Sequence, residues 1–292
     1  IYDVPLKMLE EGLDTVVLQR LRLKPKQNHD LKPWNAFLER VRNPKNFIKI
    51  GLVGKYVELQ DSYKSILESL IHAGAENETE IYVESLHSEY LESKNLKEKL
   101  ENLDGLIVAP GFGERGIEGK IMAISYARLN NVPFLGICLG MQMAVIEYAR
   151  NKVGLMNANS TEMASDCKYP VIDLMESQKS ITNKGGTMRL GSWDCNLIPN
   201  TKSAIAYQKS HINERHRHRY EFNNKFSDQI FDQDFIISGI NPETGLVEII
   251  EYNNHPWFVG VQFHPEYKST VLDPHPLFKA FVKASLEKNL KA

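Results

Sequence analysis

The sequence contains few of the features that mark secreted or membrane proteins. Only three of its 292 residues are cysteine, and a small, odd number of cysteines does not form a disulfide framework. No apolar run approaches the roughly 18 residues needed to span a bilayer, and no signal-peptide pattern opens the chain. We therefore expect a cytoplasmic protein with free thiols and no membrane partner.

An excess of either charge sign is also missing. Thirty-five Lys and Arg residues against 37 Asp and Glu residues give a formal net charge of −2. Such a balance is poor support for a dedicated nucleic-acid binder, so we expect no nucleic-acid partner. The composition instead suits a globular chain with one large or two modest domains.

The first 46 residues differ from the rest. Residues 1–23 predict a short strand or loop and then an amphipathic helix. From Arg20 to Lys45, eight basic minus two acidic residues give +6, and this stretch also holds three prolines. We interpret 24–46 as a basic, Pro-containing linker or docking segment, with an RNA-binding surface as the less favoured alternative. The chain begins at Ile1 rather than Met, so we expect it to be a piece of a longer protein.

From residue 47 to about 165, short apolar runs alternate with helical segments. Uninterrupted apolar strands are typical of a parallel sheet that is covered on both faces. The segment 61–74 predicts one of the helices, with Asp61 or Ser62 as its N-cap. After about residue 165 the pattern favours strands, some of them antiparallel, before a closing helix at 275–289. We predict an α/β fold with a mainly parallel central sheet flanked by helices, and additional antiparallel strands in the C-terminal half.

The strongest local signal surrounds Cys138, within the run PFLGICLGMQ at 133–142. An apolar strand ends at Gly136 and a helix begins after Cys138, with Gly140 two residues further on. Small residues two before and two after a nucleophile permit a tight strand-to-helix turn. The helix N-terminus favours negative charge, which lowers a thiol pKa. The alternative is a buried core thiol, which is how we interpret Cys167 and Cys195.

A candidate base lies at the end of another apolar strand. The segment 257–263 runs into His264, Pro265 and Glu266. Two residues apart in extended chain, His264 and Glu266 can share a side, so the carboxylate can orient the imidazole toward a thiol. The alternative is a solvated strand end.

A third candidate is the Gly-rich turn after the apolar run at 105–108. Its glycines allow backbone N–H groups to approach a ligand, as an oxyanion hole requires. Gly111 can supply one donor and Leu139 the other. The alternatives are a plain turn and a phosphate loop, and the latter is disfavoured because no Gly-Lys-Ser/Thr follows.

The run SHINERHRHRYE at 210–221 gathers histidines and arginines. It is either a basic loop or an anion site, because arginine binds carboxylates in bidentate fashion. A zinc site is disfavoured because no Cys or acidic pair has suitable spacing.

Three motifs in this order, PGFG, GICLGMQ and FHPE, resemble the class I (triad) glutamine amidotransferases. Further stretches resemble the glutaminase domain of the CTP synthase family, namely GLVGKY (51–56), NSTE (159–162), GGTMRLG (185–191), RHRHRYE (215–221) and FVGVQFHPE (258–266). The resemblance assigns the amidotransferase domain to 47–288. It makes 1–23 the residual tail of a synthase domain and 24–46 an interdomain linker.

The resemblance implies roles for individual residues. It implies a catalytic triad of Cys138, His264 and Glu266, and an oxyanion hole formed by Gly111 and Leu139. Glu162 would bind the ammonium group of glutamine and Arg219 its carboxylate. The implied glutamine contacts in full are Gly111, Leu139, Gly140, Met141, Gln142, Glu162 and Arg219. Many family members have Pro-Gly-Gly-Phe-Gly where this chain has Ala109-Pro110-Gly111-Phe112-Gly113, so the residue before Gly111 lacks an N–H donor.

The resemblance also implies an activity. The domain would hydrolyse L-glutamine through a cysteine thioester, and an absent synthase domain would use the ammonia to aminate ATP-activated UTP to CTP. The glutaminase domain itself would need no cofactor or metal. The full enzyme, a ligase of pyrimidine biosynthesis, would use ATP, Mg²⁺ and UTP with GTP as activator and form a homotetramer. Two alternatives stay open: a glutaminase that serves another acceptor, as in GMP synthase or anthranilate synthesis, and an isolated regulatory or assembly module with little activity.

Overall fold

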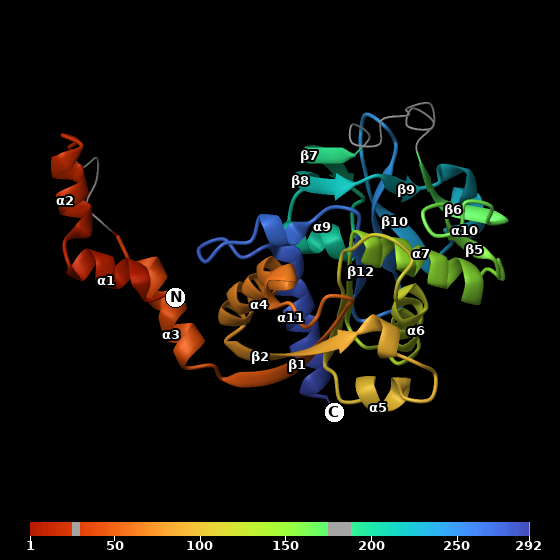
Figure 1. Ribbon diagram of the computed structural model, residues 1–292, viewed down its shortest axis with the longest axis horizontal. Coiled ribbons are helices and arrows are strands. Elements are labelled where there is room, and N and C mark those ends of the chain that lie inside the picture. The colour runs from red at the N-terminus through yellow and green to blue at the C-terminus, as the bar shows by residue number, and fades with distance from the viewer. Residues whose placement is uncertain (25–29, 175–187, 292) are drawn as a thin grey trace.

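A large sheet organises the molecule (Figure 1). In the computed structural model, which describes residues 1–24, 30–174 and 188–291, this sheet has nine strands in the order β2-β1-β3-β4-β12-β11-β10-β7-β8. One half is parallel and comprises β2 (Thr79–His87), β1 (Asn46–Gly54), β3 (Gly105–Val108), β4 (Phe134–Ile137) and β12 (Phe258–Val261).

The other half of the sheet is antiparallel. It comprises β11 (Val247–Tyr252), β10 (Phe235–Ile240), β7 (Arg189–Leu197) and β8 (His211–His218). A smaller sheet of β5 (Ala158–Ser160), β6 (Tyr169–Leu174) and β9 (Tyr220–Phe222) lies beside it. The predicted α/β class, with a mainly parallel core and antiparallel strands in the C-terminal half, is confirmed.

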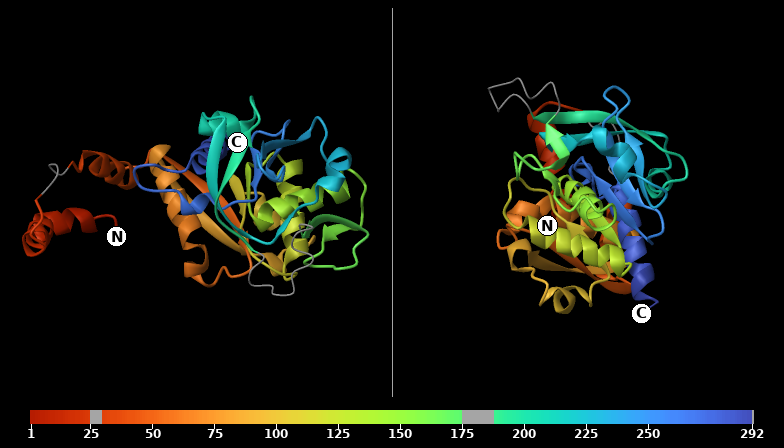
Figure 2. Two further views of the ribbon diagram at one scale, coloured as in Figure 1. Left: turned by 90° about the horizontal axis from the view of Figure 1, so that it is seen from above. Right: turned by 90° about the vertical axis from the view of Figure 1, so that its right-hand side faces the viewer.

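Helices cover both faces of the parallel half (Figures 1 and 2). One face packs against α4 (Lys64–Glu76) and α11 (Pro276–Asn289), and the other against α6 (Ile117–Leu129) and α7 (Leu139–Asn151). The shorter helices are α5 (Leu96–Leu100), α9 (Lys202–Tyr207) and α10 (Ser227–Ile230), with 3₁₀ turns η1 (Gln60–Tyr63), η2 (Ser88–Tyr90), η4 (Asn224–Phe226) and η5 (Pro265–Tyr267).

The apolar strand residues divide between two cores. In β3, Leu106 and Val108 join the cluster that contains α6 and α7, whereas Ile107 joins the cluster that contains α4 and α11. Successive side chains of a strand point to opposite faces, so a strand buried on both faces is apolar throughout. This arrangement explains why these strands show no polar alternation in the sequence.

The predicted N-cap of the helix at 61–74 is wrong. Residues 60–63 form η1, and α4 begins only at Lys64 with Tyr63 before it. The Tyr63 hydroxyl accepts hydrogen bonds from the backbone N–H groups of Lys55 and Tyr56. This tertiary contact draws the turn toward the end of β1 and overrides the local capping preference of Asp61 and Ser62.

The N-terminal segment also departs from the predictions. Instead of one helix after a strand or loop, it forms α1 (Val4–Glu10) and α2 (Leu13–Arg20), which project from the body of the molecule (Figures 1 and 2). The predicted linker is not simply a connector, because it contains α3 (Lys32–Arg42). Phe37 and Leu38 of α3 are buried against Ala75 of α4, so hydrophobic contact orders this stretch despite its prolines. The domain boundaries themselves stay a prediction.

Within the described part of the chain, no helix is both long and apolar enough to cross a membrane.

Candidate active site

Cys138 occupies a strained turn between β4 and α7. Its backbone has φ 53° and ψ −102°, a conformation that non-glycine residues rarely adopt. A Cβ on Gly136 would lie 2.8 Å from the carbonyl carbon of Gly140, and one on Gly140 would lie 2.3 Å from the Val108 oxygen. Both glycines are therefore required for the close approach of strand and helix, as expected for a nucleophile elbow.

His264 and Glu266 form a buried pair at the end of β12. The imidazole Nδ1 lies 2.7 Å from Glu266 Oε1, and η5 places both residues in one turn. The backbone N–H of His264 donates to the carbonyl oxygen of Arg215 on β8, which fixes the position of the histidine from the neighbouring strand. The other ring nitrogen, Nε2, bonds to no nitrogen or oxygen atom of the described residues, and on that side the imidazole interacts with Cys138.

Cys138 and His264 line one cavity of about 190 Å³. Its wall also includes Gly111 and its neighbours in the Gly-rich turn. The full lining is Tyr56, Ser62, Tyr63, Pro110, Gly111, Phe112, Cys138, Arg217, His264 and Tyr267. Because β4 and β12 are parallel neighbours, their carboxyl ends deliver Cys138 and His264 to the same edge of the sheet.

The surroundings of His264 favour its charged form. Burial alone would lower the pKa of the imidazole, but Cys138 and then Glu266 outweigh it and raise that pKa from 6.5 to about 11. A histidine that is protonated beside a cysteine stabilises the thiolate, which is the nucleophilic form. The Gln262 side-chain amide also points its Nε2 at Cys138 Sγ, at 3.7 Å.

The Gly-rich turn is held at both ends by side chains. Lys120 Nζ donates to the carbonyl oxygen of Ala109 at 3.0 Å, and Lys55 Nζ donates to that of Phe112. The N–H of Gly113 donates to Glu162 Oε1 at 2.8 Å. Between these fixed peptides lies the N–H of Gly111, for which no protein acceptor is found within the described residues. Gly111 is itself a lining residue of the cavity, so this N–H is available for an oxyanion.

The predicted substrate contacts fall into two groups. Glu162 lies at the turn, where burial raises the pKa of its carboxyl group while Gly113, Lys55 and Arg219 oppose that rise. The charges of Lys55 and Arg219 therefore act on the Glu162 carboxyl group. Neither Glu162 nor Arg219 is in the lining of the cavity that holds Cys138 and His264. The side chains of Leu139, Met141 and Gln142 are also outside that lining, and all three are buried.

The first residues of α7 offer the cavity their backbone. Leu139 begins the helix directly after Cys138, and the first N–H groups of a helix have no intrahelical acceptor. The side-chain amide of Gln142 is occupied, since it donates to Tyr220 O and to Gln262 Oε1. Any contact from Leu139, Gly140 or Met141 to a substrate would therefore come from main-chain N–H groups.

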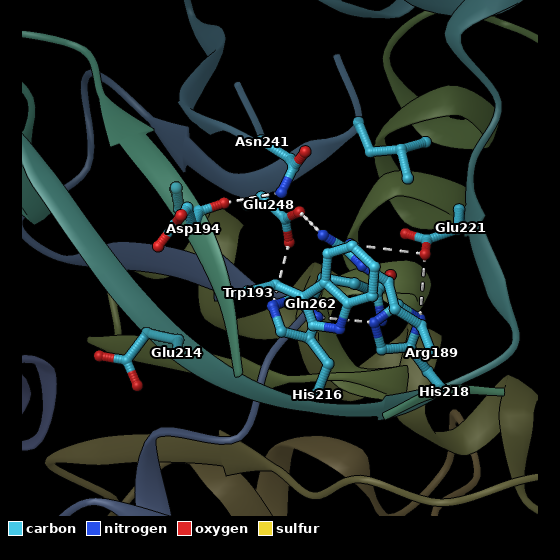
Figure 3. Close-up of polar contacts among 12 residues, drawn as sticks. Arg189, Trp193, Asp194, Glu214, His216, His218, Glu221, Asn241, Glu248 and Gln262 are labelled. Atoms are coloured by element: carbon cyan, nitrogen blue, oxygen red, sulfur yellow. Dashed lines mark hydrogen bonds and ion pairs between the residues drawn. The ribbon is translucent and has the colours of Figure 1, made fainter. Parts of the chain in front are cut away.

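The run RHRHRYE forms a strand and not a basic loop, so that interpretation is wrong. In β8 the exposed and buried positions alternate, which turns Arg215 and Arg217 outward and His216 and His218 inward. Figure 3 shows the two histidines facing each other, with Nδ1 of His216 2.8 Å from Nε2 of His218. Only Met188–Gly191 of the GGTMRLG motif is described, since 185–187 lie outside the described residues.

A buried ionic network surrounds these histidines (Figure 3). Arg189 of β7 lies 2.7 Å from Glu248 and 3.5 Å from Glu221. His216 is 3.5 Å from Glu248, and His218 is 3.4 Å from Glu221. Burial, together with the charges of Arg189 and His264, lowers the pKa of His218 to about 3. We call these five residues the Arg189 network.

The sequence alone assigns no role to Lys55, Lys120 or Gln262, although all three contact the site. Gln262 directly precedes the FHPE motif, so position alone could have drawn attention to it. Lys120 sits in the middle of a helical segment where nothing in the local pattern distinguishes it. All three cysteines are free, and burial raises the pKa of Cys195, which suits an inert thiol.

No group of three or more His, Cys, Asp or Glu side chains is placed to hold a metal ion in the described ranges.

Comparison with known proteins identifies the family. The family model "Glutamine amidotransferase class-I" matches residues 58–284. A CTP synthase of Christiangramia forsetii is 62% identical over 291 residues, covering 100% of this chain and 53% of the relative. One of Flavobacterium johnsoniae is 60% identical, covering 100% and 54%. The chain thus spans about half the length of the curated relatives it matches.

Solved structures agree with this assignment. The Trypanosoma brucei CTPS glutaminase domain with bound acivicin is 35% identical, with a TM-score of 0.77, covering 82% of this chain and 94% of that one. A GMP-synthase-like protein of Thermoplasma acidophilum is 17% identical with a TM-score of 0.53, covering 84% and 96%, and shows the fold alone. Because the relatives at about 60% identity are CTP synthases, the GMP-synthase-like alternative is not favoured. The chain belongs to the class-I glutamine amidotransferases, in their CTP synthase branch.

Proposed function

We propose that this chain hydrolyses L-glutamine with Cys138 as nucleophile, His264 as acid and base, and Glu266 as the group that orients His264. The observation that carries the proposal is the meeting of a strained Cys138 with a buried His264–Glu266 pair in one cavity. The thiolate attacks the side-chain carboxamide carbon, and the carbonyl oxygen becomes negative. The N–H groups of Gly111 and Leu139 hold that oxygen.

Collapse of the tetrahedral intermediate breaks the carbon–nitrogen bond. His264 gives its proton to the departing ammonia, which leaves a γ-glutamyl thioester on Cys138. A water molecule then transfers a proton to the neutral imidazole and attacks the thioester carbon. The carbon–sulfur bond breaks, which releases glutamate and restores the thiolate beside a protonated His264.

Two charged side chains select the amino-acid end of the substrate. Glu162 binds the α-ammonium group and Arg219 the α-carboxylate, and the electrostatic effect of Arg219 on Glu162 supports their placement in one subsite. Gly140, Met141 and Gln142 contribute only through the start of α7. An amino acid with both charges and a side-chain amide of the right length is then favoured over its analogues.

In the whole enzyme, the ammonia serves a synthase domain that aminates ATP-activated UTP to CTP. The support is the family assignment together with the coverage of only half of each relative. ATP, Mg²⁺ and UTP belong to that domain, GTP acts as activator, and the enzyme is a homotetramer. A cytoplasmic location accords with three free thiols.

The test is ammonia release from L-glutamine by this chain, with and without GTP and a supplied synthase domain. We expect hydrolysis by the chain that increases when both are added, and none by Cys138→Ala. A Cys138→Ala variant that still released ammonia would overturn the assignment. Stimulation by the added domain without CTP formation, when ATP, Mg²⁺ and UTP are also supplied, would contradict the proposed acceptor.

A further inference from the structure

Lys120 is fully buried on α6, although lysine is among the residues least often found inside proteins. A buried ammonium group is costly unless it is paired, because the interior solvates charge poorly. The acceptor found for Nζ is the carbonyl oxygen of Ala109, at 3.0 Å. Because burial of this ammonium group costs solvation free energy, packing alone does not explain a lysine beside the Gly-rich turn.

The hydrogen bond from Lys120 to Ala109 fixes the peptide that precedes Gly111 in the Gly-rich turn. The Ala109–Pro110 peptide has no N–H, so its carbonyl oxygen is its only hydrogen-bonding group. A Cβ on Gly111 would lie 3.7 Å from Lys120 Nζ. The Lys120 side-chain nitrogen therefore lies next to Gly111. By holding the Ala109 carbonyl group, it limits rotation of the adjoining Pro110–Gly111 peptide, which carries the Gly111 N–H.

The charge of Lys120 is also linked to the nucleophile. Burial is the largest effect on the pKa of Lys120, Lys55 acts in the same direction and Cys138 opposes them, and together they lower the pKa from 10.5 to about 7. Lys55, from the end of β1, and Cys138, from the elbow, are thus the titratable groups that act on it. A Coulombic interaction is reciprocal, so in its charged form, which is populated up to about pH 7, Lys120 attracts negative charge at the elbow.

We propose that Lys120 is a positioning residue for glutamine hydrolysis, which aims the Gly111 N–H at the reacting oxygen and places a positive charge behind the thiolate and the oxyanion. The proposal rests on the proposed function. It adds a residue from α6, a helix that contributes none of the described residues lining the cavity.

This role predicts opposite changes in stability and activity. Lys120→Met keeps an unbranched side chain of similar length and removes a buried charge, so the variant should melt no lower than the wild type. Between pH 7 and 10.5 the unfolded chain binds one more proton at Lys120 than the folded chain, so this group makes stability rise with pH. Any gain in melting temperature in the variant should thus be larger at pH 6 than at pH 9.

The experiment compares the wild type with Lys120→Met, Lys120→Gln and a control, Lys202→Met. Lys202 is half-buried, whereas Lys120 is fully buried, but it likewise donates to backbone carbonyls, those of Tyr252 and Asn253. These carbonyls lie beside the start of β12, whereas Cys138 and His264 follow the carboxyl ends of β4 and β12. We measure kcat and KM for glutamine, the pH dependence of Cys138 alkylation by iodoacetamide, and the melting temperature. The last two readouts need no glutaminase activity, so they separate a failure of this proposal from a failure of the proposed function.

We expect Lys120→Met to lower kcat by about 10-fold to 100-fold with KM changed by less than about 3-fold. This loss is smaller than the roughly 10²-fold to 10³-fold loss for removal of an oxyanion donor, because the Gly111 N–H is misaligned rather than removed. Its alkylation midpoint should move to higher pH. Lys120→Gln retains an N–H donor for Ala109, so its kcat should be higher than that of Lys120→Met. Its alkylation midpoint should stay at the higher pH expected for Lys120→Met, because glutamine carries no charge. An unchanged kcat and midpoint in a folded Lys120→Met, or equal losses in Lys202→Met, would overturn the proposal. If Lys120→Met fails to fold, a Lys120→Gln variant whose alkylation midpoint equals that of the wild type would also overturn the proposal.

Discussion

His264 and the buried histidines of the Arg189 network lie close together in this molecule, but they differ in charge state. His264 has a carboxylate at 2.7 Å and a thiol across the cavity, and its pKa is raised to about 11. His218, buried to a similar degree, has Arg189 and His264 as neighbours, and its pKa falls to about 3. Burial disfavours the cation in both, so the sign of the nearest charges decides the outcome.

The comparison separates a reactive site from a structural one. His264 lines a cavity together with Cys138, whereas the Arg189 network is enclosed and its charged groups face one another. β8 connects the two regions, because it carries His216 and His218 on its buried face and its Arg215 carbonyl holds the His264 backbone. Four changes test this contrast.

The largest effect on activity is expected from Glu266→Gln. This change removes the negative partner of His264, so the pKa of the imidazole falls. A smaller fraction of His264 then carries the proton that the leaving ammonia needs. We expect kcat for glutamine hydrolysis to drop by about 10²-fold to 10⁴-fold. The matched control is Glu214→Gln, which breaks the buried contact of Glu214 with His275, outside the cavity, at 3.2 Å. Equal losses of kcat in both variants would contradict the contrast.

The largest effect on stability is expected from Arg189→Met. It leaves Glu221 and Glu248 buried without their cation, which should lower the free energy of unfolding by about 3–5 kcal/mol. Replacing all three residues by apolar ones of similar size should restore most of the loss, because no uncompensated charge remains. Urea titration of the single and triple variants measures both values. A single variant as stable as the wild type would show that the network is not ionised as described.

A change of stability with pH is expected from the same carboxyl groups. Burial raises the pKa of Glu221 to about 8 and that of Glu248 to about 7, while Arg189 opposes both shifts. Between pH 4.5 and 8 the folded chain therefore binds more protons than the unfolded chain, and these groups make stability fall as pH rises. Glu221→Gln should flatten this decline in thermal melts at pH 5, 6, 7 and 8. A decline as steep as in the wild type would contradict the assignment.

The smallest effect is expected from Cys195→Ala. Cys195 is buried in the core on β7 and lies outside the cavity lining. Removal of the thiol should cost about 1 kcal/mol of unfolding free energy or less, with kcat per folded molecule unchanged. An activity loss comparable to that of Cys138→Ala would show that the sequence identifies the wrong nucleophile.

The fold was predictable where both faces of a strand are buried. There the apolar runs of β3, β4 and β12 and the helices between them follow from local pattern alone. The pattern failed where a distant contact decides the structure. Tyr63 replaces the predicted N-cap because its hydroxyl reaches the backbone of Lys55, and α3 forms because Phe37 finds a partner on α4.

The site was predictable where chemistry and chain geometry coincide. Cys138 needs small neighbours at fixed spacing, and His264 needs a carboxylate two residues away, so both leave a signature in sequence. Lys120 and the Arg189 network leave none, because their partners come from separate elements that only the fold brings together. The alternation within β8 was hidden because its buried positions hold histidines rather than apolar residues.

The most direct test of the proposed triad is mass spectrometry of the chain after incubation with an electrophilic glutamine analogue. We predict one adduct per chain, on Cys138, that excess L-glutamine prevents and that Glu266→Gln slows. An adduct on Cys167 or Cys195, or no adduct on a chain whose Cys138 is reduced and folded, would contradict the triad.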